Sequence, residues 1–266
     1  MKTDYSNYTD FYKIFSTSNG YYEACDYLSF QNNRWQGIDK YIDLISRAIT
    51  DTKKRFGRDK ILMVDIGCGA YGWLQRYFSE STSKIICTDS NKDALNQIEL
   101  LKNPLVETIQ DNAFSLEKIF SLGHKFGFIY CGFNMYEGFI DNFLKLTAPG
   151  GCIFLMKPKM GDDLILRSLV RNYDILPRYK EITNITANLE KETEVKYWEE
   201  TFSWKFEDKN TDKLLAAMSV VCLGEQILMT KEQYDIAVDF VRLRTSNDMV
   251  FMSQTFALWQ AVKKND

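Results

Sequence analysis

The chain has 266 residues, and its 33 Lys plus Arg against 36 Asp plus Glu give a net charge of −3. This length fits one large domain or a domain with an appendage, and it can bury a core without disulfides or a structural metal. The charge balance argues against a nucleic-acid partner. Because the sequence lacks a bilayer-length apolar run and a signal-peptide start, we expect a soluble, cytoplasmic protein with no membrane contact.

The first 55 residues have a helical pattern. Four aromatic residues within 8–15 fall at i, i+3, i+4 and i+7, on one face of a helix, and the same apolar spacing recurs over 38–49. Between them, 20–27 is predicted as a shorter helix or a lid-like turn. We expect 1–55 to form an N-terminal helical lid that contributes to a substrate site, with 56–266 as the main domain.

Apolar runs alternate with helical segments from residue 60 onward. Continuous apolar runs are typical of parallel strands covered on both faces, and their alternation with helices is typical of βαβ units. We therefore predict an α/β fold with a doubly wound, mostly parallel seven-stranded sheet. The predicted strands are 60–65, 84–88, 105–109, 126–131, 152–156, 195–204 and 255–262.

Further helices are predicted in the second half of the chain, over 162–171, 211–223 and 230–244. The last of them begins with a capping-box pattern, Thr230 with Gln233. The last two helices form a predicted helical cap insertion, 208–246, between the last two strands.

The six cysteines and the single histidine limit the chemistry. No two cysteines have C-x-x-C spacing, and His124 alone cannot complete a Cys/His zinc site, so we expect reduced thiols and no metal. Serine or cysteine catalytic sets that need a histidine are excluded unless His124 is the base. Its place in a polar turn favours a surface loop.

The strongest motif is a glycine-rich turn that follows the first predicted strand. It reads Asp65-x-Gly67-x-Gly69-x-x-Gly72, and glycines there permit a tight turn and let a ligand approach the backbone closely. Asp89 lies at the end of the next predicted strand, where its carboxylate could accept hydrogen bonds from both hydroxyls of a ribose.

The acid before the glycines indicates which ligand fits. A carboxylate at Asp65 would repel the pyrophosphate of a dinucleotide, whereas it would attract an ammonium group. S-adenosylmethionine carries an amine and a ribose and has no phosphate. The motif therefore favours this cofactor.

Four segments between about 58 and 157 resemble class I S-adenosylmethionine-dependent methyltransferases. Val64–Gly72 is similar to the first motif of that family, and Thr88-Asp89-Ser90 to its ribose-binding acid. Gln110–Phe114 is similar to the segment that flanks adenine, where Asp111 would hold the exocyclic amine. Ala148–Gly151 resembles the turn before the family's fifth strand. The resemblance implies a Rossmann-like methyltransferase with S-adenosyl-L-methionine as cofactor.

A looser resemblance concerns the layout of the flanks. Helices before the sheet and between its last strands are similar to small-molecule methyltransferases of the histamine N-methyltransferase type, which implies a capped pocket. Enzymes that methylate nucleobase or glutamine amines often carry Asn-Pro-Pro-Tyr after the fourth strand. Here the segment is Cys131–Tyr136, which argues against that substrate class.

The resemblance and the geometry that methyl transfer requires lead us to expect three sets of site residues. The cofactor set is Arg34, Asp65, Gly67, Cys68, Gly69, Gly72, Asp89, Ser90, Asp111, Asn112, Ala113 and Cys131. Arg34 could pair with the cofactor carboxylate if its segment, 31–35, closes over the cofactor, or the segment could be a plain loop. The substrate set is Tyr21, Phe133, Tyr136, Trp198 and Trp204, and the catalytic set is Tyr22, Glu23 and Glu137. Aromatic faces could hold an amine through cation–π contact or stack on an aromatic acceptor, while Glu23 or Glu137 could orient or deprotonate it. Each could instead be an ordinary core ring or a solvated carboxylate.

We therefore expect an S-adenosylmethionine-dependent methyltransferase that acts on a nitrogen or oxygen of a small molecule by in-line transfer, as a monomer or homodimer. Two alternatives stay open. One is a transferase that moves the aminocarboxypropyl group of the same cofactor, as nicotianamine-like synthases do. The other is a non-catalytic, cofactor-binding partner subunit, against which the intact cofactor motifs argue.

Overall fold

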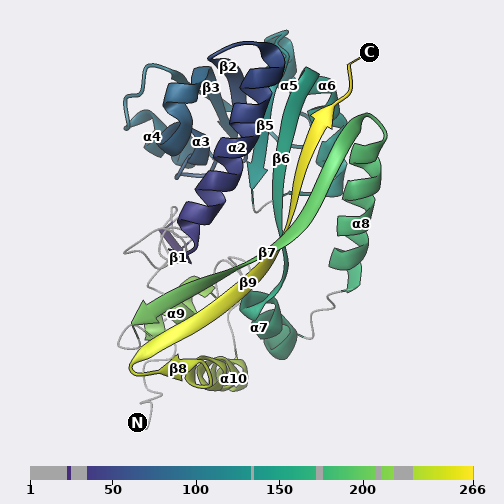
Figure 1. Ribbon diagram of the computed structural model, residues 1–266. Coiled ribbons are helices and arrows are strands. Elements are labelled where there is room, and N and C mark those ends of the chain that lie inside the picture. Colours follow the sequence, from purple (N-terminus) through teal and green to yellow (C-terminus); the bar gives the residue numbers. More distant parts are fainter. Residues whose placement is uncertain are drawn as a thin grey trace. The chain divides into compact units, whose positions relative to one another are not determined.

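The computed structural model describes residues 23–24, 35–132, 135–171, 176–207, 211–218 and 230–265 (Figure 1). The strands are β1 (Trp35–Gln36), β2 (Ile61–Ile66), β3 (Thr82–Asp89), β4 (Val106–Gln110), β5 (Phe126–Gly132), β6 (Thr147–Gly161), β7 (Thr193–Glu207), β8 (Thr245–Ser246) and β9 (Met249–Lys263). The α-helices are α2 (Ile38–Phe56), α3 (Trp73–Phe78), α4 (Lys92–Glu99), α5 (Glu117–Ser121), α6 (Ile140–Leu146), α7 (Asp162–Arg171), α8 (Leu176–Glu190), α9 (Thr211–Met218) and α10 (Lys231–Arg242). Short 3-10 helices are η4 (Ser79–Ser81) and η5 (Glu137–Phe139).

The strands form one nine-stranded sheet in the order β1-β7-β9-β6-β5-β2-β3-β4, with β8 paired to β9. The pairs β2/β3, β3/β4, β2/β5 and β5/β6 are parallel. The chain runs outward from β2 through β3 to β4 and then returns to place β5 on the other side of β2. Ligands of open α/β sheets bind at such a reversal, beside the carboxyl ends of the strands.

The predicted α/β class with a doubly wound, mostly parallel sheet is confirmed. The seven predicted strands are β2 to β7 and β9, and the two-residue strands β1 and β8 are added to them. In Figure 1 the arrowheads of β7 and β9 point in opposite directions, so the end of the sheet is antiparallel. Helices α9 and α10 lie between these two strands along the chain.

The chain divides into two compact units. The core unit comprises 39–159, 177–200 and 256–266, and it contains the glycine turn and the parallel strands. The accessory unit comprises the described residues within 1–38, 160–176 and 201–255. Each unit is described below by itself.

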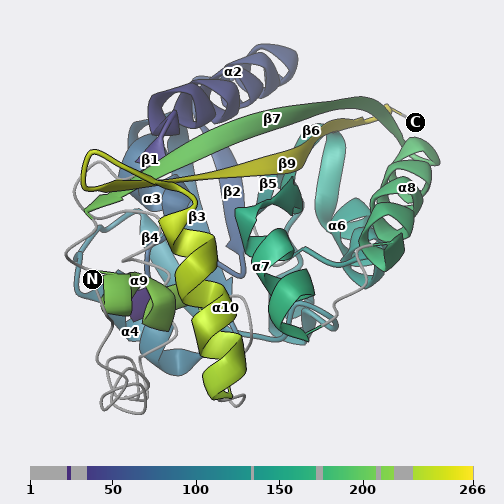
Figure 2. The ribbon, with the colours of Figure 1, turned by 90° about the horizontal axis from the view of Figure 1, so that it is seen from below.

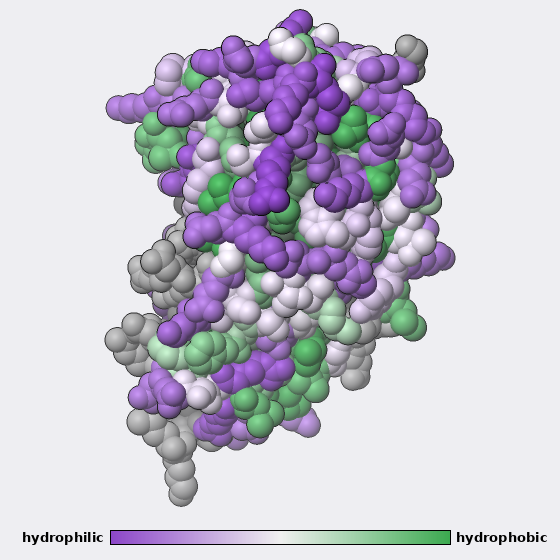
Figure 3. Space-filling model, viewed as in Figure 1, coloured by the Kyte–Doolittle hydropathy of each residue, from purple (hydrophilic) through white to green (hydrophobic). Residues whose placement is uncertain are grey.

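Helices cover both faces of the core unit's sheet. One face packs against α5, α6 and α8 in a cluster that includes Val64, Ile129, Phe143, Ile185 and Trp259. The other face carries α2, and Figure 2 shows α2 and α6 on opposite sides of the strands. Helix α2 is amphipathic: its buried side includes Tyr41, Ile45 and Ile49, while Lys40, Asp43 and Arg47 are exposed. On the side seen in Figure 3, hydrophilic side chains predominate and hydrophobic ones form smaller groups between them.

Three features differ from the sequence-based expectations or lie outside the described residues. Pro149-Gly150-Gly151 is no separate turn, because it lies within β6 as a bulge: Phe126 pairs with Thr147, whereas Phe128 pairs with Cys152. Helix α8 was not predicted at all. The aromatic stripe within 8–15 and most of the expected lid lie outside the described residues, so the N-terminal lid stays a prediction.

In the accessory unit, one buried carboxylate joins three elements. Asp162, at the start of α7, accepts hydrogen bonds from Arg244 Nε at 2.6 Å and from the backbone N–H of Ser253, on β9, at 2.6 Å. The Arg244 guanidinium also stacks on Phe240 of α10, 3.6 Å from the ring centroid. The capping box of α10 is confirmed, with Thr230 and Gln233 bonded reciprocally.

We predict that Arg244→Met lowers the free energy of unfolding by about 2–3 kcal/mol, because it leaves the Asp162 carboxylate buried without its charged partner. Arg242→Met is the matched control. Arg242 pairs with Asp239 at an exposed position, and such pairs contribute at most about 1 kcal/mol. Chemical denaturation followed by circular dichroism measures both variants, and equal losses would contradict the prediction.

Candidate cofactor site

The glycine turn lies between β2 and α3, as predicted. Gly67, Gly69 and Gly72 have φ of 67°, 57° and 61°, a left-handed conformation that other residues rarely adopt. The backbone N–H groups of Gly67 and Cys68 both donate to the carbonyl of Thr88, at 2.8 and 3.0 Å. The turn is therefore fastened to the end of β3.

Gly72 also lies close to two side chains, which would have to move to admit a larger residue. A Cβ added there would lie 2.4 Å from the Nε2 atom of Gln75 and 2.7 Å from Ile98. The third glycine therefore brings the turn against α4 as well as allowing its backbone conformation.

Asp65 lies at the carboxyl end of β2, just before the glycine turn, and is more deeply buried than Asp89 and Asp111. It is 1% exposed, its Oδ2 accepts a long hydrogen bond from the backbone N–H of Leu74 at 3.5 Å, and its Oδ1 is buried without a hydrogen-bond partner. Burial raises the pKa of this carboxyl to about 7, against the weaker opposing effect of the Leu74 bond. A buried carboxylate in this state fits a cationic ligand group that supplies the missing donor.

Two tyrosines occupy the neighbourhood of Asp65. Tyr130 is its partner in the β2/β5 register, and the hydroxyls of Tyr130 and Tyr41 form a buried hydrogen bond of 2.6 Å. Burial raises the pKa of both tyrosines, so they remain neutral donors and acceptors. Across the described part of the chain, no Lys or Arg forms an ion pair with Asp65.

Asp89 lies at the end of β3 and is partly exposed. Its Oδ2 accepts the backbone N–H of Gly69 at 3.0 Å, and its Oδ1 accepts that of Asn91 at 2.9 Å. One carboxylate thus connects the glycine turn to the loop that begins α4. Its predicted contact with a ribose stays a prediction.

Asp111 follows β4, and its N–H donates to the carbonyl of Asp89 at 3.1 Å, so the two acids lie at the same edge of the sheet. Its Oδ2 accepts the N–H groups of Lys118 and Ile119 at 2.9 and 3.0 Å, and its Oδ1 accepts that of Asn112. Asp111 therefore caps the start of α5. The resemblance implies that Asp111 also contacts adenine, and it would do so while keeping these bonds.

The other predicted cofactor residues are distributed along this edge. Ser90 and Asn112 are exposed, Ala113 is half-buried, and Cys68 and Cys131 are buried. Burial raises the pKa of Cys131, which makes a thiolate role there unfavourable. Arg34 lies outside the described residues.

The predicted acceptor residues are divided between the units. Tyr21, Tyr22 and Phe133 lie outside the described residues. Glu23 is exposed and Trp204 buried, both in the accessory unit. In the core unit, the ring of Trp198 packs edge-on against Phe154 at 6.1 Å, within the aromatic layer that also holds Tyr41. Tyr136 and Glu137 follow β5, at the same edge as Asp65.

Glu137 is held by a helix that sequence analysis did not predict. Its carboxylate accepts the side-chain N–H groups of Asn184 at 2.9 Å and Asn188 at 3.3 Å, both on α8. Its backbone N–H donates to Glu181 of the same helix at 3.3 Å. These bonds fix the position of Glu137, and its predicted catalytic role stays a prediction.

Lys157 completes this network and was also missed. It is 5% exposed on β6, and its Nζ donates to the carbonyl of Met135 at 2.6 Å and pairs with Glu181 at 3.0 Å. The polar residues of α8 at 181, 184 and 188 recur at helical spacing beside the apolar Ile182, Ile185 and Leu189. This double pattern was the signal from which the helix could have been predicted.

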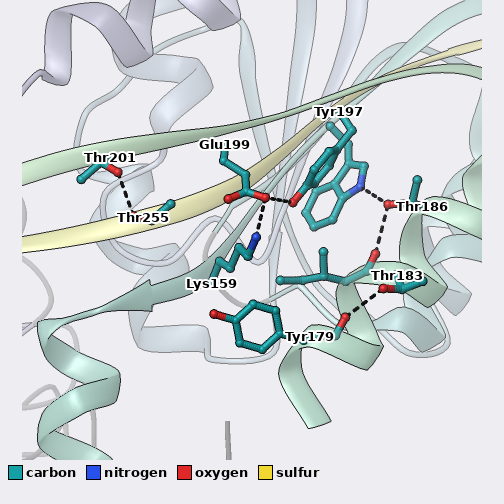
Figure 4. Close-up of polar contacts among 10 residues, drawn as sticks. Lys159, Tyr179, Thr183, Thr186, Tyr197, Glu199, Thr201 and Thr255 are labelled. Carbon is teal, nitrogen blue, oxygen red and sulfur yellow. Dashed lines mark hydrogen bonds and ion pairs between the residues drawn. The ribbon is translucent and has the colours of Figure 1, made fainter. Parts of the chain in front are cut away.

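A second set of polar contacts lies beside α8, and one of them joins this helix to the sheet (Figure 4). Trp259 of β9 donates to Thr186 at 2.9 Å, and near it Lys159 pairs with Glu199 at 2.5 Å. Tyr197 donates to the same carboxylate at 2.7 Å. The hydrogen bond from Lys159 lowers the pKa of Glu199, and burial raises the pKa of Tyr197. Both shifts favour an ionised Glu199 that is paired with Lys159 and accepts a hydrogen bond from a neutral Tyr197.

Neither a membrane span nor a metal cluster is found in the described ranges. No helix there is long and apolar enough to cross a bilayer. Within the same residues, no group of three or more His, Cys, Asp and Glu side chains is arranged to hold a metal ion.

A search against known protein families found no match, and neither did a search against curated proteins. Solved structures do match. A candidate methyltransferase from Bacillus halodurans aligns with a TM-score of 0.52 and 14% identity, over 81% of this chain and 100% of its own. The YcgJ protein from Bacillus subtilis aligns with the same TM-score and identity, over 83% of this chain and 100% of its own. Together with the strand order, these likenesses show that the chain has the Rossmann-like fold of the class I S-adenosylmethionine-dependent methyltransferases.

Proposed function

We propose that this protein is an S-adenosylmethionine-dependent methyltransferase that methylates a nitrogen or oxygen of a small molecule. A fold alone does not establish an activity, so the proposal depends on the site. The observation that carries it is the buried Asp65 oxygen without a hydrogen-bond partner, which lies beside a glycine turn at the reversal of strand order. That carboxylate matches the ammonium group of the cofactor.

The residues of the core unit would divide the binding of the cofactor among them. Asp65 would pair with the ammonium group, and the backbone of the turn would lie against the ligand where glycines leave space. Asp89 would accept hydroxyl groups of the ribose while it keeps its bond to Gly69. When bound, S-adenosylmethionine supplies an activated methyl group, so the protein has mainly to position the acceptor and exclude water.

The surroundings of Glu137 support a positioning role. Each of its carboxylate oxygens accepts a hydrogen bond from an amide of α8, which holds the side chain in one orientation. Glu137 therefore serves, in this proposal, to orient the loop after β5. Tyr22 and Glu23 stay predictions as acceptor-site residues.

The reaction products distinguish this function from the aminocarboxypropyl transfer that the sequence left open. We expect incubation with S-adenosylmethionine and a panel of small-molecule phenols and amines to release S-adenosylhomocysteine, identified by mass spectrometry. Methylthioadenosine as the product would instead establish aminocarboxypropyl transfer. Cofactor binding with neither product across the panel would favour a non-catalytic subunit.

We predict that Asp89→Ala weakens binding of S-adenosylhomocysteine by at least tenfold, because it removes the carboxylate that would accept the two ribose hydroxyls and the turn loses its bond to Asp89. Asp93→Ala is the matched control, since this acid is exposed in the first turn of α4. Isothermal titration calorimetry measures both. Unchanged affinity in Asp89→Ala would rule out its role in binding.

Asp65 generates a prediction about pH. The pKa of Asp65 is about 7 in the folded protein and about 4 in an unfolded chain. The folded protein therefore binds the carboxyl proton more tightly. The stability that this gives is complete below pH 4 and is lost as the pH rises through 7. We expect wild-type stability to fall by about 2–3 kcal/mol relative to Asp65→Asn between pH 5 and pH 8. Chemical denaturation at a series of pH values tests this.

The same variant links stability to ligand binding. Asp65→Asn should lose most of its affinity for S-adenosylhomocysteine, although it becomes the more stable protein at high pH. Asp59→Asn, at an exposed position before β2, should follow the wild type in both measurements. Parallel stability profiles for wild type and Asp65→Asn would show that Asp65 titrates normally.

A further inference from the structure

A groove of about 370 Å³ lies beside α3 in the core unit, and we name it the α3 groove. Its volume is within the range of small-molecule sites, roughly 300–1,000 Å³. The lining comes from α3, from the turn before it and from the loop before β4. The described residues that line it are Tyr71, Gln75, Arg76, Tyr77, Leu101 and Asn103. The predicted cofactor, substrate and catalytic sets contain none of them.

One end of the α3 groove lies toward the edge of the sheet opposite to the cofactor acids. The side-chain amide of Asn103 donates to Ser79 Oγ at 2.7 Å. Asn103 precedes β4 and Ser79 precedes β3, so this contact lies near the amino ends of two parallel strands. Asp89 and Asp111 lie at or next to the carboxyl ends of the same strands. The groove is therefore a separate place from the cofactor edge, although Tyr71 connects it to the glycine turn.

The side-chain amide of Gln75 is buried in this lining without a hydrogen bond. Gln75 is 5% exposed, and neither its Oε1 nor its Nε2 atom has a partner among the described residues. Its side chain lies against the glycine turn, because a Cβ added to Gly72 would lie 2.4 Å from Nε2. A buried amide without partners costs free energy, so a ligand that supplies both an acceptor and a donor is favoured there. A secondary amide group supplies both.

Arg76 presents a guanidinium group whose orientation is fixed. Its Nε donates to the carbonyl of Tyr71 at 2.6 Å, and the group lies over the ring of Tyr71, 4.2 Å from the centroid. Within the described ranges, no acid forms an ion pair with it. Its two terminal nitrogens are therefore left to donate, and a planar guanidinium binds a carboxylate through two parallel hydrogen bonds.

The rest of the lining adds an apolar rim and no opposing charge. Arg76 is the only charged side chain among the described lining residues, so this lining carries a net positive charge. Tyr77 and Leu101 are 38% and 45% exposed and offer apolar surface to a ligand. The α3 groove thus combines a position for an anion, a position for an amide and a position for an apolar group.

We propose that the α3 groove binds a small N-acylated amino acid with an apolar side chain. The carboxylate of this ligand pairs with Arg76, its amide meets Gln75, and its side chain lies on the rim. Gln75 and Arg76 are consecutive residues, which suits a ligand whose carboxylate and amide are attached to the same carbon atom. A simple anion would leave Gln75 without partners, and a neutral amide would leave Arg76 without one. This site goes beyond methyl transfer and does not depend on it.

The experiment titrates N-acetyl-L-phenylalanine into the full-length protein and follows binding by NMR. We expect a dissociation constant of about 1 mM or lower, which a ligand of this size can reach. Two further probes each lack one group: N-acetyl-L-phenylalaninamide lacks the carboxylate, and 3-phenylpropanoate lacks the amide. Each should bind at least tenfold more weakly, and so should inorganic phosphate. No binding of N-acetyl-L-phenylalanine, or equal binding of any of the other three, would overturn the proposal.

Variants of the two recognition residues test their roles. Arg76→Met and Gln75→Met should each weaken binding of N-acetyl-L-phenylalanine by at least tenfold. Arg58→Met and Gln97→Met, at exposed positions outside the groove, are the matched controls and should leave it unchanged. Gln75→Met should not lower the free energy of unfolding, because it removes a buried amide that has no partner. Wild-type affinity in both Arg76→Met and Gln75→Met, or a marked loss of stability in Gln75→Met, would overturn the site.

A longer probe tests whether the ligand is a small molecule. Acetyl-tetraglycyl-phenylalanine carries the same carboxylate, amide and ring at the end of a peptide. We expect it to bind no more tightly than N-acetyl-L-phenylalanine. Tighter binding would assign the groove to the C-terminus of a polypeptide and overturn its assignment to a small molecule.

A second titration separates this inference from the proposed function. We expect N-acetyl-L-phenylalanine to bind with the same affinity when the protein is saturated with S-adenosylhomocysteine. If S-adenosylhomocysteine displaces the probe, the probe occupies the cofactor site, and the inference fails alone. If S-adenosylhomocysteine does not bind to the wild type, the proposed function fails alone, because titration of the unliganded protein still tests the α3 groove.

Discussion

A buried carboxylate without a matching charge is the constraint on which the cofactor edge depends. Asp65 lies buried at the end of a central strand, and one of its oxygens has no hydrogen bond. The nearby carboxylate of Asp89 adds to the effect of burial in raising its pKa. Removing a charge from water is costly unless a partner replaces the water, so this position stores free energy that a cationic ligand group can release. The same cost raises the pKa of Asp65, because binding a proton removes the buried charge.

The other acids of this edge have their hydrogen bonds satisfied by the protein. Asp89 accepts N–H groups from the glycine turn and from the start of α4, Asp111 caps α5, and Glu137 is held by α8. These bonds hold the loops in place before any ligand arrives, which lowers the entropy that binding must remove. Asp65 therefore differs from these acids in having a buried oxygen without a hydrogen bond, and the remaining acids hold the loops that shape the site.

The central strands and the glycine turn could be predicted because their signals are local. A continuous apolar run indicates a buried strand, and the left-handed conformations at Gly67, Gly69 and Gly72 require glycine. Helix α8 was missed because Thr and Asn, which favour turns and caps, are interleaved with its three buried apolar residues. The contacts of Lys157 could not be predicted at all. They join residues far apart in the chain, so no spacing pattern records them.

The aromatic residues of the core unit are used in two different ways. In the core unit, Tyr41 of α2 packs with Tyr130 and Phe154 of the sheet in a buried layer, which contributes packing and one hydrogen bond between two hydroxyls. Phe114 and Tyr136 are instead exposed at the edge that holds the cofactor acids. Core packing therefore accounts for the first group of rings, whereas the exposed faces of Phe114 and Tyr136 contribute little to it.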